Sequence, residues 1–416
     1  MNKHEPLITN DAVIFGILML ILMFVFSTSS SDNKFWKKFY SFVPTILVCY
    51  FLPSLLSTFG IIDAHDSQLY FVASRYLLPA SLVLLTISVD LKELAKLGPK
   101  AIVMFLTGTV GIMFGGPLAI ILFSYIAPDV INAPPPNEVW RGLTTVAGSW
   151  IGGGANQAAM KEVFEVSDDI FSKVVAVDII IANIWLAIMM VGIGRNEWVN
   201  KKLKADDSSI EILKRKMADF QQSVWRIPTA SDFFKVLGIG FICTALGHWL
   251  ADLIVPFIVE NYPQLKNYSL DSTFFWIVVI ATTLGVALSF TRARQLEAAG
   301  ASKIGTVFIF ILVATIGTHM DILAIFDNPG LFLVGFVWIS IHALLMIIVA
   351  RLIKAPLFFI AVGSQANVGG AASAPVVASY FHPSLAPVGV LLAVLGYALG
   401  TYGAYICGLM MQVVSP

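Results

Sequence analysis

The sequence predicts an all-α protein that spans a membrane many times, arranged as two inverted repeats. Of its 416 residues, 57% are hydrophobic and only 12% are charged, about half the charged share of a soluble domain. Apolar runs long enough to cross a bilayer recur along the whole chain. Two stretches rich in glycine and amides, residues 148–157 and 363–370, interrupt that apolar pattern once in each half.

Composition and motifs also exclude several classes of function. The net charge of zero argues against nucleic acid as a partner. The histidines and cysteines show no metal-ligand spacing, and we read the three cysteines as small packing residues. No Walker motif and no strand–glycine–helix unit is present. We therefore expect no enzyme activity and no cofactor, apart from a sodium ion or proton as coupling ion.

Ten apolar runs are predicted to cross the membrane as helices. The first one follows a single lysine without a cleavage pattern, so it predicts a membrane helix and not a signal peptide. The two glycine stretches extend to broken segments over residues 143–162 and 356–380, because glycine is costly inside a helix. The ten runs are residues 12–26, 39–59, 70–89, 101–127 and 171–194 in the first half, and 235–259, 274–290, 304–323, 331–350 and 386–411 in the second.

Loop charges set the expected orientation, because lysine and arginine favour the cytoplasmic side. The connections after residues 26 and 89, and the long segment 195–231, are rich in lysine or arginine, whereas the connection with Asp129 and Glu138 is not. One crossing, residues 171–194, already leads from this outside connection to the inside. Segment 143–162 should therefore return as a re-entrant hairpin that enters from outside.

In the second half, the loop charges predict the opposite direction of entry for the glycine-rich segment. Arg351 and Lys354 precede segment 356–380, so this hairpin should enter from the cytoplasm. The halves, residues 1–194 and 232–416, would then form inverted repeats joined by a cytoplasmic connection over 195–231. Both termini are expected outside, in the inner membrane of a bacterium. The weak sequence similarity between the halves, at an offset of 215 residues, adds little support to the inverted repeat.

The cytoplasmic connection carries an amphipathic helix pattern. Ser208 and Glu211 have the spacing of a capping box, and apolar residues repeat at steps of three and four between Ile210 and Val224. We expect this helix to lie on the membrane surface. A homodimer contact, or packing on the body of the protein, would fit the same pattern.

The two broken segments hold the candidate site. Broken backbone is tolerated at membrane depth where it is buried in protein or lines a cavity, and paired interruptions point to a transporter's binding site. Amides and hydroxyls offer donors and acceptors without a buried charge. The alternative is close helix packing by small residues, as at Gly396 and Gly400. The candidates are Ser149, Gly152, Gly153, Gly154, Asn156 and Gln157, with Ser364, Gln365, Asn367, Gly369, Gly370 and Ser373.

Asp178 is the one carboxylate well inside a strongly apolar run, and Asn183 follows it. An ionisable group at that depth is a functional hypothesis by default. Asp178 could ligate a cation or exchange a proton, or it could lie near a helix end and pair with Lys173. We expect sodium ligands among Asn156, Gln157, Asp178, Gln365 and Asn367.

The paired stretches GSWIGGGANQAA and GSQANVGGAASAP, with Asp178 after the first, resemble the YjcL-like bacterial membrane proteins, a family of unknown function. That family is distantly similar to the bile acid–sodium symporters, the glutamate–sodium symporters and the 2-hydroxycarboxylate carriers. The resemblance implies a core of crossed broken helices, a separate panel or dimerisation domain, and elevator-like movement. It also implies a crossing point at residues 152–156 and 367–370.

These expectations together predict a secondary transporter in the lipid bilayer. It would move a small organic solute, which we expect to be anionic, with sodium or protons by alternating access. A cation–proton antiporter without organic substrate is the first alternative. A non-transporting membrane scaffold is the second.

Overall fold

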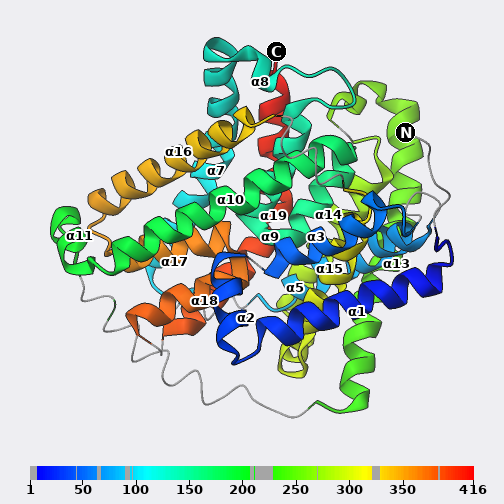
Figure 1. The fold of residues 1–416 in the computed structure, drawn as a ribbon, viewed down its shortest axis with the longest axis horizontal. Helices are drawn as coiled ribbons and strands as arrows, with labels where there is room; N and C mark the ends of the chain where they lie inside the picture. Colours follow the sequence, from blue (N-terminus) through cyan, green and yellow to red (C-terminus); the bar gives the residue numbers. More distant parts are fainter. Residues whose placement is uncertain are drawn as a thin grey trace.

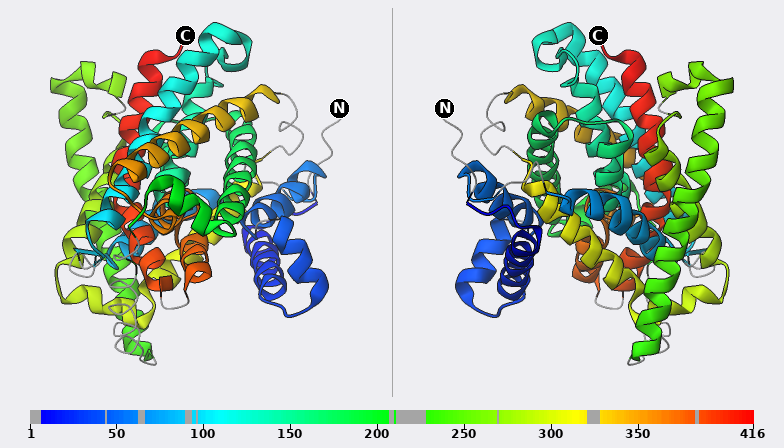
Figure 2. Two further views of the ribbon diagram at one scale, coloured as in Figure 1. Left: turned by 90° about the vertical axis from the view of Figure 1, so that its left-hand side faces the viewer. Right: turned by 90° about the vertical axis from the view of Figure 1, so that its right-hand side faces the viewer.

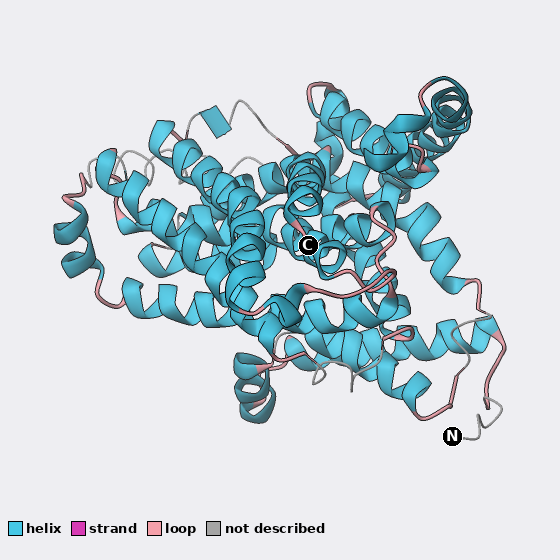
Figure 3. Ribbon diagram, turned by 90° about the horizontal axis from the view of Figure 1, so that it is seen from above, coloured by secondary structure: helices cyan, strands magenta, loops and turns pink. Residues whose placement is uncertain are grey.

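The computed structural model describes residues 7–43, 45–62, 67–89, 94–95, 97–206, 210, 228–268, 270–320, 328–382 and 385–416. Helices and the loops between them make up this part of the chain, and no strand occurs in it (Figure 3). The amphipathic helix predicted between Ser208 and Val224 lies outside the described residues, apart from Ile210. Each of the ten predicted spans contains helix among its described residues, and the all-α polytopic prediction is confirmed.

Seven of the described helices are each long and apolar enough to cross a membrane, if the continuous stretch Leu69–Thr86 (α4, η1 and α5) counts as one helix. The number rises to as many as nine if each of two bent helix pairs forms one span. Figure 1 follows them along the chain. The helices are α1 (Asp11–Ser29), α2 (Lys34–Phe42), α3 (Thr45–Thr58), α4 (Leu69–Val72), η1 (Ala73–Leu77), α5 (Leu78–Thr86), α7 (Pro99–Ile126), α8 (Pro128–Ile131), α9 (Val139–Val163), α10 (Asp168–Ile193), α11 (Asn196–Leu203), α13 (Ala230–Asn261), η2 (Pro263–Tyr268), α14 (Thr273–Ser289), η3 (Arg292–Ala299), α15 (Ala301–Gly317), α16 (Gly330–Leu352), α17 (Leu357–Val368), α18 (Gly370–Phe381) and α19 (Ala386–Val414).

The helices form two sets, and each set draws on both halves of the chain. In the scaffold set, α15 packs on α3 and α5, α13 and α14 pack on α5, and α1 packs on α3. In the hairpin set, α7 packs on α16, α9 on α19, and α17 on α7 and α18. Figure 2 shows the N-terminal helices α1 to α3 at one side of the molecule, away from the C-terminal α19. The chain therefore does not divide into one compact unit per half.

Small residues allow these helices to approach closely. A Cβ atom added to Gly115 of α7 would lie 2.5 Å from the Trp338 ring of α16, and one added to Gly285 of α14 would lie 2.9 Å from the Val83 carbonyl oxygen of α5. Such contacts need the absence of a side chain, as expected at membrane helix interfaces. Many glycines of this chain therefore serve packing.

Helices α7 and α16 run antiparallel and define the two ends of the hairpin set. At one end, Lys100 in the first turn of α7 donates to the Lys354 carbonyl after α16 (3.2 Å). At the other end, Asn328 before α16 donates to the Val130 carbonyl of α8 (2.9 Å). We call the end with Lys100 and Lys354 the α11 end, and the end with Asn328 and Val130 the α8 end. Arg351 also donates to the Lys202 carbonyl (2.5 Å), so three connections predicted to be cytoplasmic meet at the α11 end.

Candidate functional site

The first glycine stretch folds back on itself within α9. Gly153 has φ +73° and breaks the helix, a backbone conformation that glycine adopts without steric cost. Arg141 near the start of α9 then donates to the Phe164 carbonyl just after its end (2.8 Å), although a straight helix would separate the two residues by roughly 34 Å. The Trp140 and Phe164 rings meet edge to face at 5.9 Å. We call residues 139–163 the first hairpin; its base lies near α8.

The second glycine stretch folds back in the same way. Gly370 has φ +57° at the junction of α17 and α18. The rings of Phe358 at the start of α17 and Phe381 at the end of α18 meet edge to face at 5.3 Å. Residues 357–381 form the second hairpin, and its base lies at the α11 end, where the Leu357 amide donates to Asn200 of α11 (2.8 Å). The two hairpins therefore enter the hairpin set from opposite ends.

The two hairpin tips meet at one glycine of α19. A Cβ atom on Gly396 would lie 2.8 Å from the Ile151 carbonyl oxygen and 3.2 Å from the Ala366 carbonyl oxygen. Only a residue without a side chain fits between these two backbones. Opposite entry and contact of the tips are what inverted repeats would produce. The relation between the complete halves stays a prediction.

Asn156 locks the first tip to α19. Its amide nitrogen donates to the Gly152 carbonyl (2.9 Å) and to the Tyr397 carbonyl (3.2 Å). Its amide oxygen accepts from the Thr401 hydroxyl (2.7 Å). The side chain is completely buried, so every polar atom of this amide is occupied by the protein itself.

Asn367 locks the second tip to α7 with the same pattern. Its amide nitrogen donates to the Gly363 carbonyl (2.9 Å) and to the Phe105 carbonyl (3.0 Å). Its amide oxygen accepts from the Thr109 hydroxyl (2.8 Å). In both locks, the threonine lies one helical turn after the residue whose carbonyl accepts.

Behind the second tip, Ser364 belongs to a buried chain of hydrogen bonds. Trp185 Nε1 donates to the Ser364 hydroxyl oxygen, and His342 Nε2 lies at the same distance from it, 2.8 Å in each case. His342 Nδ1 lies 2.9 Å from the Gly108 carbonyl. Because that carbonyl can only accept, Nδ1 donates to it, so both ring nitrogens of His342 have partners within the protein.

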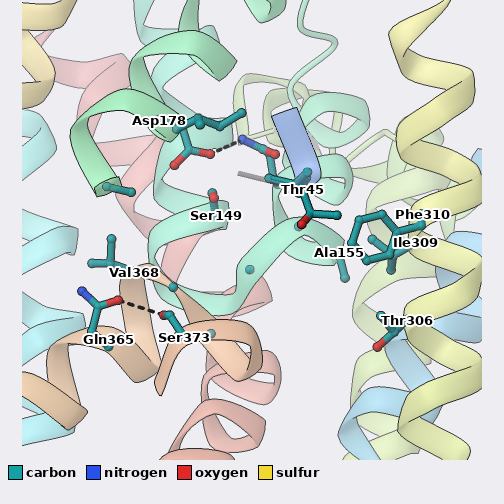
Figure 4. A pocket seen from close by; sticks show the side chains of 18 of the residues that line it. Thr45, Ser149, Ala155, Asp178, Thr306, Ile309, Phe310, Gln365, Val368 and Ser373 are labelled. Carbon is teal, nitrogen blue, oxygen red and sulfur yellow. Dashed lines mark hydrogen bonds between the residues drawn. The ribbon is translucent and has the colours of Figure 1, made fainter. Parts of the chain in front are cut away.

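A cavity of about 490 Å³ lies between the two hairpins, α10 and the scaffold helices α3 and α15. This volume suits a small organic molecule. Figure 4 shows Asp178 and Ser149 above Gln365 and Ser373, with Thr306, Ile309 and Phe310 of α15 across the cavity. Among the described residues that line it, Asp178 is the one with a formal charge, since none is lysine, arginine or histidine.

Asp178 is held by neutral donors. Trp150 Nε1 donates to one carboxylate oxygen (2.6 Å) and Gln157 Nε2 to the other (2.7 Å). The residue is 5% exposed. Lys173, the partner that the sequence suggested as an alternative, pairs with Asp169 instead (2.9 Å). The carboxylate is thus oriented by hydrogen bonds without an opposite charge.

The glutamine of each hairpin lines the cavity beside its break. Tyr50 on α3 donates to the Gln157 oxygen (3.3 Å), which leaves Gln157 Nε2 for Asp178. On the second hairpin, Ser373 donates to the Gln365 oxygen (2.8 Å). Gln365 Nε2 is buried without a hydrogen-bond partner among the described residues.

Ten of the fourteen predicted site residues line the cavity, and four lie behind its wall. Gly152, Asn156, Ser364 and Asn367 belong to the tip contacts and bonds described above. These four residues do not line the cavity, and their assignment to the site stays a prediction. The ten lining residues are Ser149, Gly153, Gly154, Gln157, Asp178, Asn183, Gln365, Gly369, Gly370 and Ser373.

Sequence reasoning missed the partners of these residues. Trp150 and Tyr50 hold Asp178 and Gln157, and Thr109 and Thr401 complete the asparagine locks. Trp150 stood inside the first glycine stretch, so its indole N–H was a visible signal. The other three lie in ordinary apolar helices, where nothing in the local pattern sets them apart.

A charge network connects the base of the first hairpin to the scaffold set. Arg75 in the π-helical turn η1 pairs with Glu162 (2.7 Å), and Lys161 pairs with Asp168 at the start of α10 (2.9 Å). Tyr70 joins both pairs, because it donates to Glu162 and accepts from Lys161. Lys161 is only 7% exposed, so breaking one of these pairs would leave a largely buried charge.

These features define a helical multi-pass membrane protein with two broken-helix hairpins. The model of the family described as "Protein of unknown function (DUF819)" matches residues 16–414, and the chain belongs to this family. It is also 25% identical over 356 residues to the "Uncharacterized membrane protein YjcL" of Bacillus subtilis (strain 168), a match that covers 81% of this chain and 82% of that protein. The predicted resemblance to YjcL-like proteins is confirmed.

Proposed function

We propose that this protein is a secondary active transporter that moves a small organic solute together with sodium ions or protons. The observation that carries the proposal is the cavity between two hairpins that enter from opposite ends and meet at Gly396. Discontinuous helices that meet beside a cavity are typical of transporter binding sites. A scaffold protein would have no need for broken backbone around a cavity that holds a carboxylate.

Asp178 is the residue that we assign to cation coupling. An ionised carboxylate held by neutral donors leaves a net negative charge in the cavity, which a sodium ion or proton would compensate. An anionic solute entering alone would place a second negative charge beside it. Solute and cation would therefore bind together, which is the requirement for symport.

Alternating access would follow from movement of the hairpin set against the scaffold set. The cavity is lined by residues of both sets, so relative movement changes its walls. The ion pairs of Arg75 with Glu162, and the bond between Tyr50 and Gln157, cross between the sets. These contacts would separate during the transition.

A cation–proton antiporter is the second candidate, because Asp178 is the sole charged side chain among the described cavity residues. Proteoliposomes with internal dyes for both pH and sodium, given a sodium gradient, distinguish the candidates. A symporter moves cations when a mixture of organic acids and amino acids is added. An antiporter moves protons against sodium without any solute. Absence of cation movement under both conditions would leave the scaffold alternative.

A further inference from the structure

An apolar groove of about 230 Å³ lies on the outer surface between α10 and α16, apart from the cavity between the hairpins. Trp185 and Ile339 are its least exposed lining residues, at 5% and 4%. Its other large apolar side chains are exposed on both helices, and they are Ile184, Ile188, Phe336, Leu344 and Ile347. Hydrocarbon is the surrounding that suits such a surface.

The groove has the length of one bilayer leaflet. From Phe336 to Ile347, α16 rises by roughly 16 Å. The hydrocarbon core of a bilayer is about 30 Å thick, so one leaflet contributes about half of that. Ala343 lies within this stretch and lines the groove, where its small side chain leaves room for a chain of methylene groups.

Basic side chains stand where the groove reaches the α11 end. Arg351 lies one turn after Ile347 on the same face of α16. Arg195 follows the last turn of α10, and both arginines are exposed. Arg351 also donates to the Lys202 carbonyl, which holds α11 beside the end of α16. Figure 1 shows α11 next to the ends of both helices.

Helix α11 adds a third cation and an aromatic ring. The Lys202 ammonium lies 5.8 Å from the centre of the Trp198 ring, and Trp198 is 62% exposed. Arg195, Trp198 and Lys202 follow each other at steps of three and four residues, so they share one face of this helix. Tryptophan is enriched at the boundary between membrane and water. This face therefore lies at the level of lipid headgroups.

The three cations call for an anion from the surroundings. No described carboxylate forms an ion pair with Arg195, Lys202 or Arg351. The planar guanidinium group matches the geometry of phosphate oxygens. Connections predicted to be cytoplasmic meet at this end, and anionic lipids attract basic residues on the cytoplasmic side.

We propose that the groove between α10 and α16 binds an anionic phospholipid, with an acyl chain in the groove and the phosphate at Arg195, Lys202 and Arg351. This site is separate from the solute cavity and does not depend on the proposed function. Asn200 of α11 accepts from the Leu357 amide, so a lipid that holds α11 also supports the base of the second hairpin.

Native mass spectrometry of the detergent-purified protein tests this inference. The probes are phosphatidylglycerol, phosphatidylcholine with the same acyl chains, and glycerol 3-phosphate. We expect phosphatidylglycerol to bind at least tenfold more tightly than phosphatidylcholine, because the latter carries no net charge. Glycerol 3-phosphate should not bind at the same concentrations, since it lacks the chains that fill the groove.

Variants test the two parts of the site separately. Arg195→Gln and Arg351→Gln should each weaken phosphatidylglycerol about fivefold, the loss expected for one basic residue near a membrane surface. Ala343→Phe should remove the bound lipid by filling the groove while leaving the cations in place. Lys235→Gln and Ala245→Phe are the matched controls at exposed positions of α13, and both should bind lipid as the parent does.

Equal binding of the two phospholipids would indicate ordinary surrounding lipid and would overturn the inference. Tight binding of glycerol 3-phosphate would indicate a site for a free anion instead. A dimer mass without retained lipid would assign the groove to a second copy of this chain, which also contradicts the proposal. If Ala343→Phe does not fold, the exposed arginines still decide, because unchanged phosphatidylglycerol binding in both arginine variants excludes the site.

Discussion

The two hairpins are alike in backbone and different in what their polar groups bind. Each turns at a glycine with positive φ, closes its base with an aromatic pair, and locks its tip with an asparagine bonded to a neighbouring helix. The shared features belong to the fold. The difference lies at the glutamines, because Gln157 meets Asp178 while Gln365 Nε2 meets no described residue.

This comparison separates polar groups that are fully bonded within the protein from those that are not. A buried amide whose atoms all bond to the protein, such as Asn156, stabilises the tip. Gln365 differs, because its Nε2 has no hydrogen-bond partner among the described residues. Residue type alone does not distinguish the two.

The largest effect is expected from filling the contact between the tips. Gly396→Ala would place a Cβ atom 2.8 Å from one hairpin's carbonyl oxygen and 3.2 Å from the other's. Because both neighbours are backbone, we expect a loss of about 1–3 kcal/mol in the free energy of unfolding, measured by denaturant titration, with loss of transport.

Gly238→Ala is the matched control, since its added Cβ would have nothing within 4 Å. Alanine is favoured over glycine in a helix interior, so this control should be neutral or stabilising by up to about 1 kcal/mol. If both substitutions had the same effect, close approach of the tips at Gly396 would be wrong.

The asparagine locks test whether the two tips are equivalent. Asn156→Ala and Asn367→Ala each remove three side-chain hydrogen bonds, two to backbone carbonyls and one from a threonine hydroxyl. We expect each to lower the free energy of unfolding by about 1–3 kcal/mol. A large loss for one variant and none for the other would show that the two asparagines do not contribute equally to stability.

Smaller effects should follow when only the threonine of each lock is changed. Thr401→Val and Thr109→Val keep the shape of the side chain and remove its bond to the asparagine, together with a second bond to Thr282 or to the Phe105 carbonyl. Each lost hydrogen bond should cost about 0.5–1.5 kcal/mol. Double-mutant cycles with the asparagine variants measure the coupling directly. A coupling energy near zero in both cycles would contradict the hydrogen bonds between these threonines and asparagines.

Much of the architecture was predictable because its signals are local. Apolar runs marked the helices, and glycines such as Gly153 and Gly370 marked the two breaks. Lysine and arginine in the connections indicated opposite entry of the two hairpins. Asp178 was identifiable because a carboxylate in an apolar run is costly unless it is partnered.

The division of labour among the site residues was not predictable. Asn156 and Gln157 are adjacent in the sequence, yet one is bonded to α19 and the other lines the cavity. Which of them faces the cavity depends on contacts with helices far away in the chain. The composition of the scaffold and hairpin sets was not predictable for the same reason. Each set contains helices from both halves, because packing between helices far apart in the chain determines which helices belong together.

The central claim is that Asp178 couples a cation to the cavity between the hairpins. Its most direct test is the melting temperature of the purified protein, titrated with sodium at two pH values, for the parent and for Asp178→Asn. The account predicts that sodium or acidification stabilises the parent and that Asp178→Asn removes this response. Asp252→Asn, at an exposed site in α13, should keep it. An unchanged response in Asp178→Asn would contradict the account.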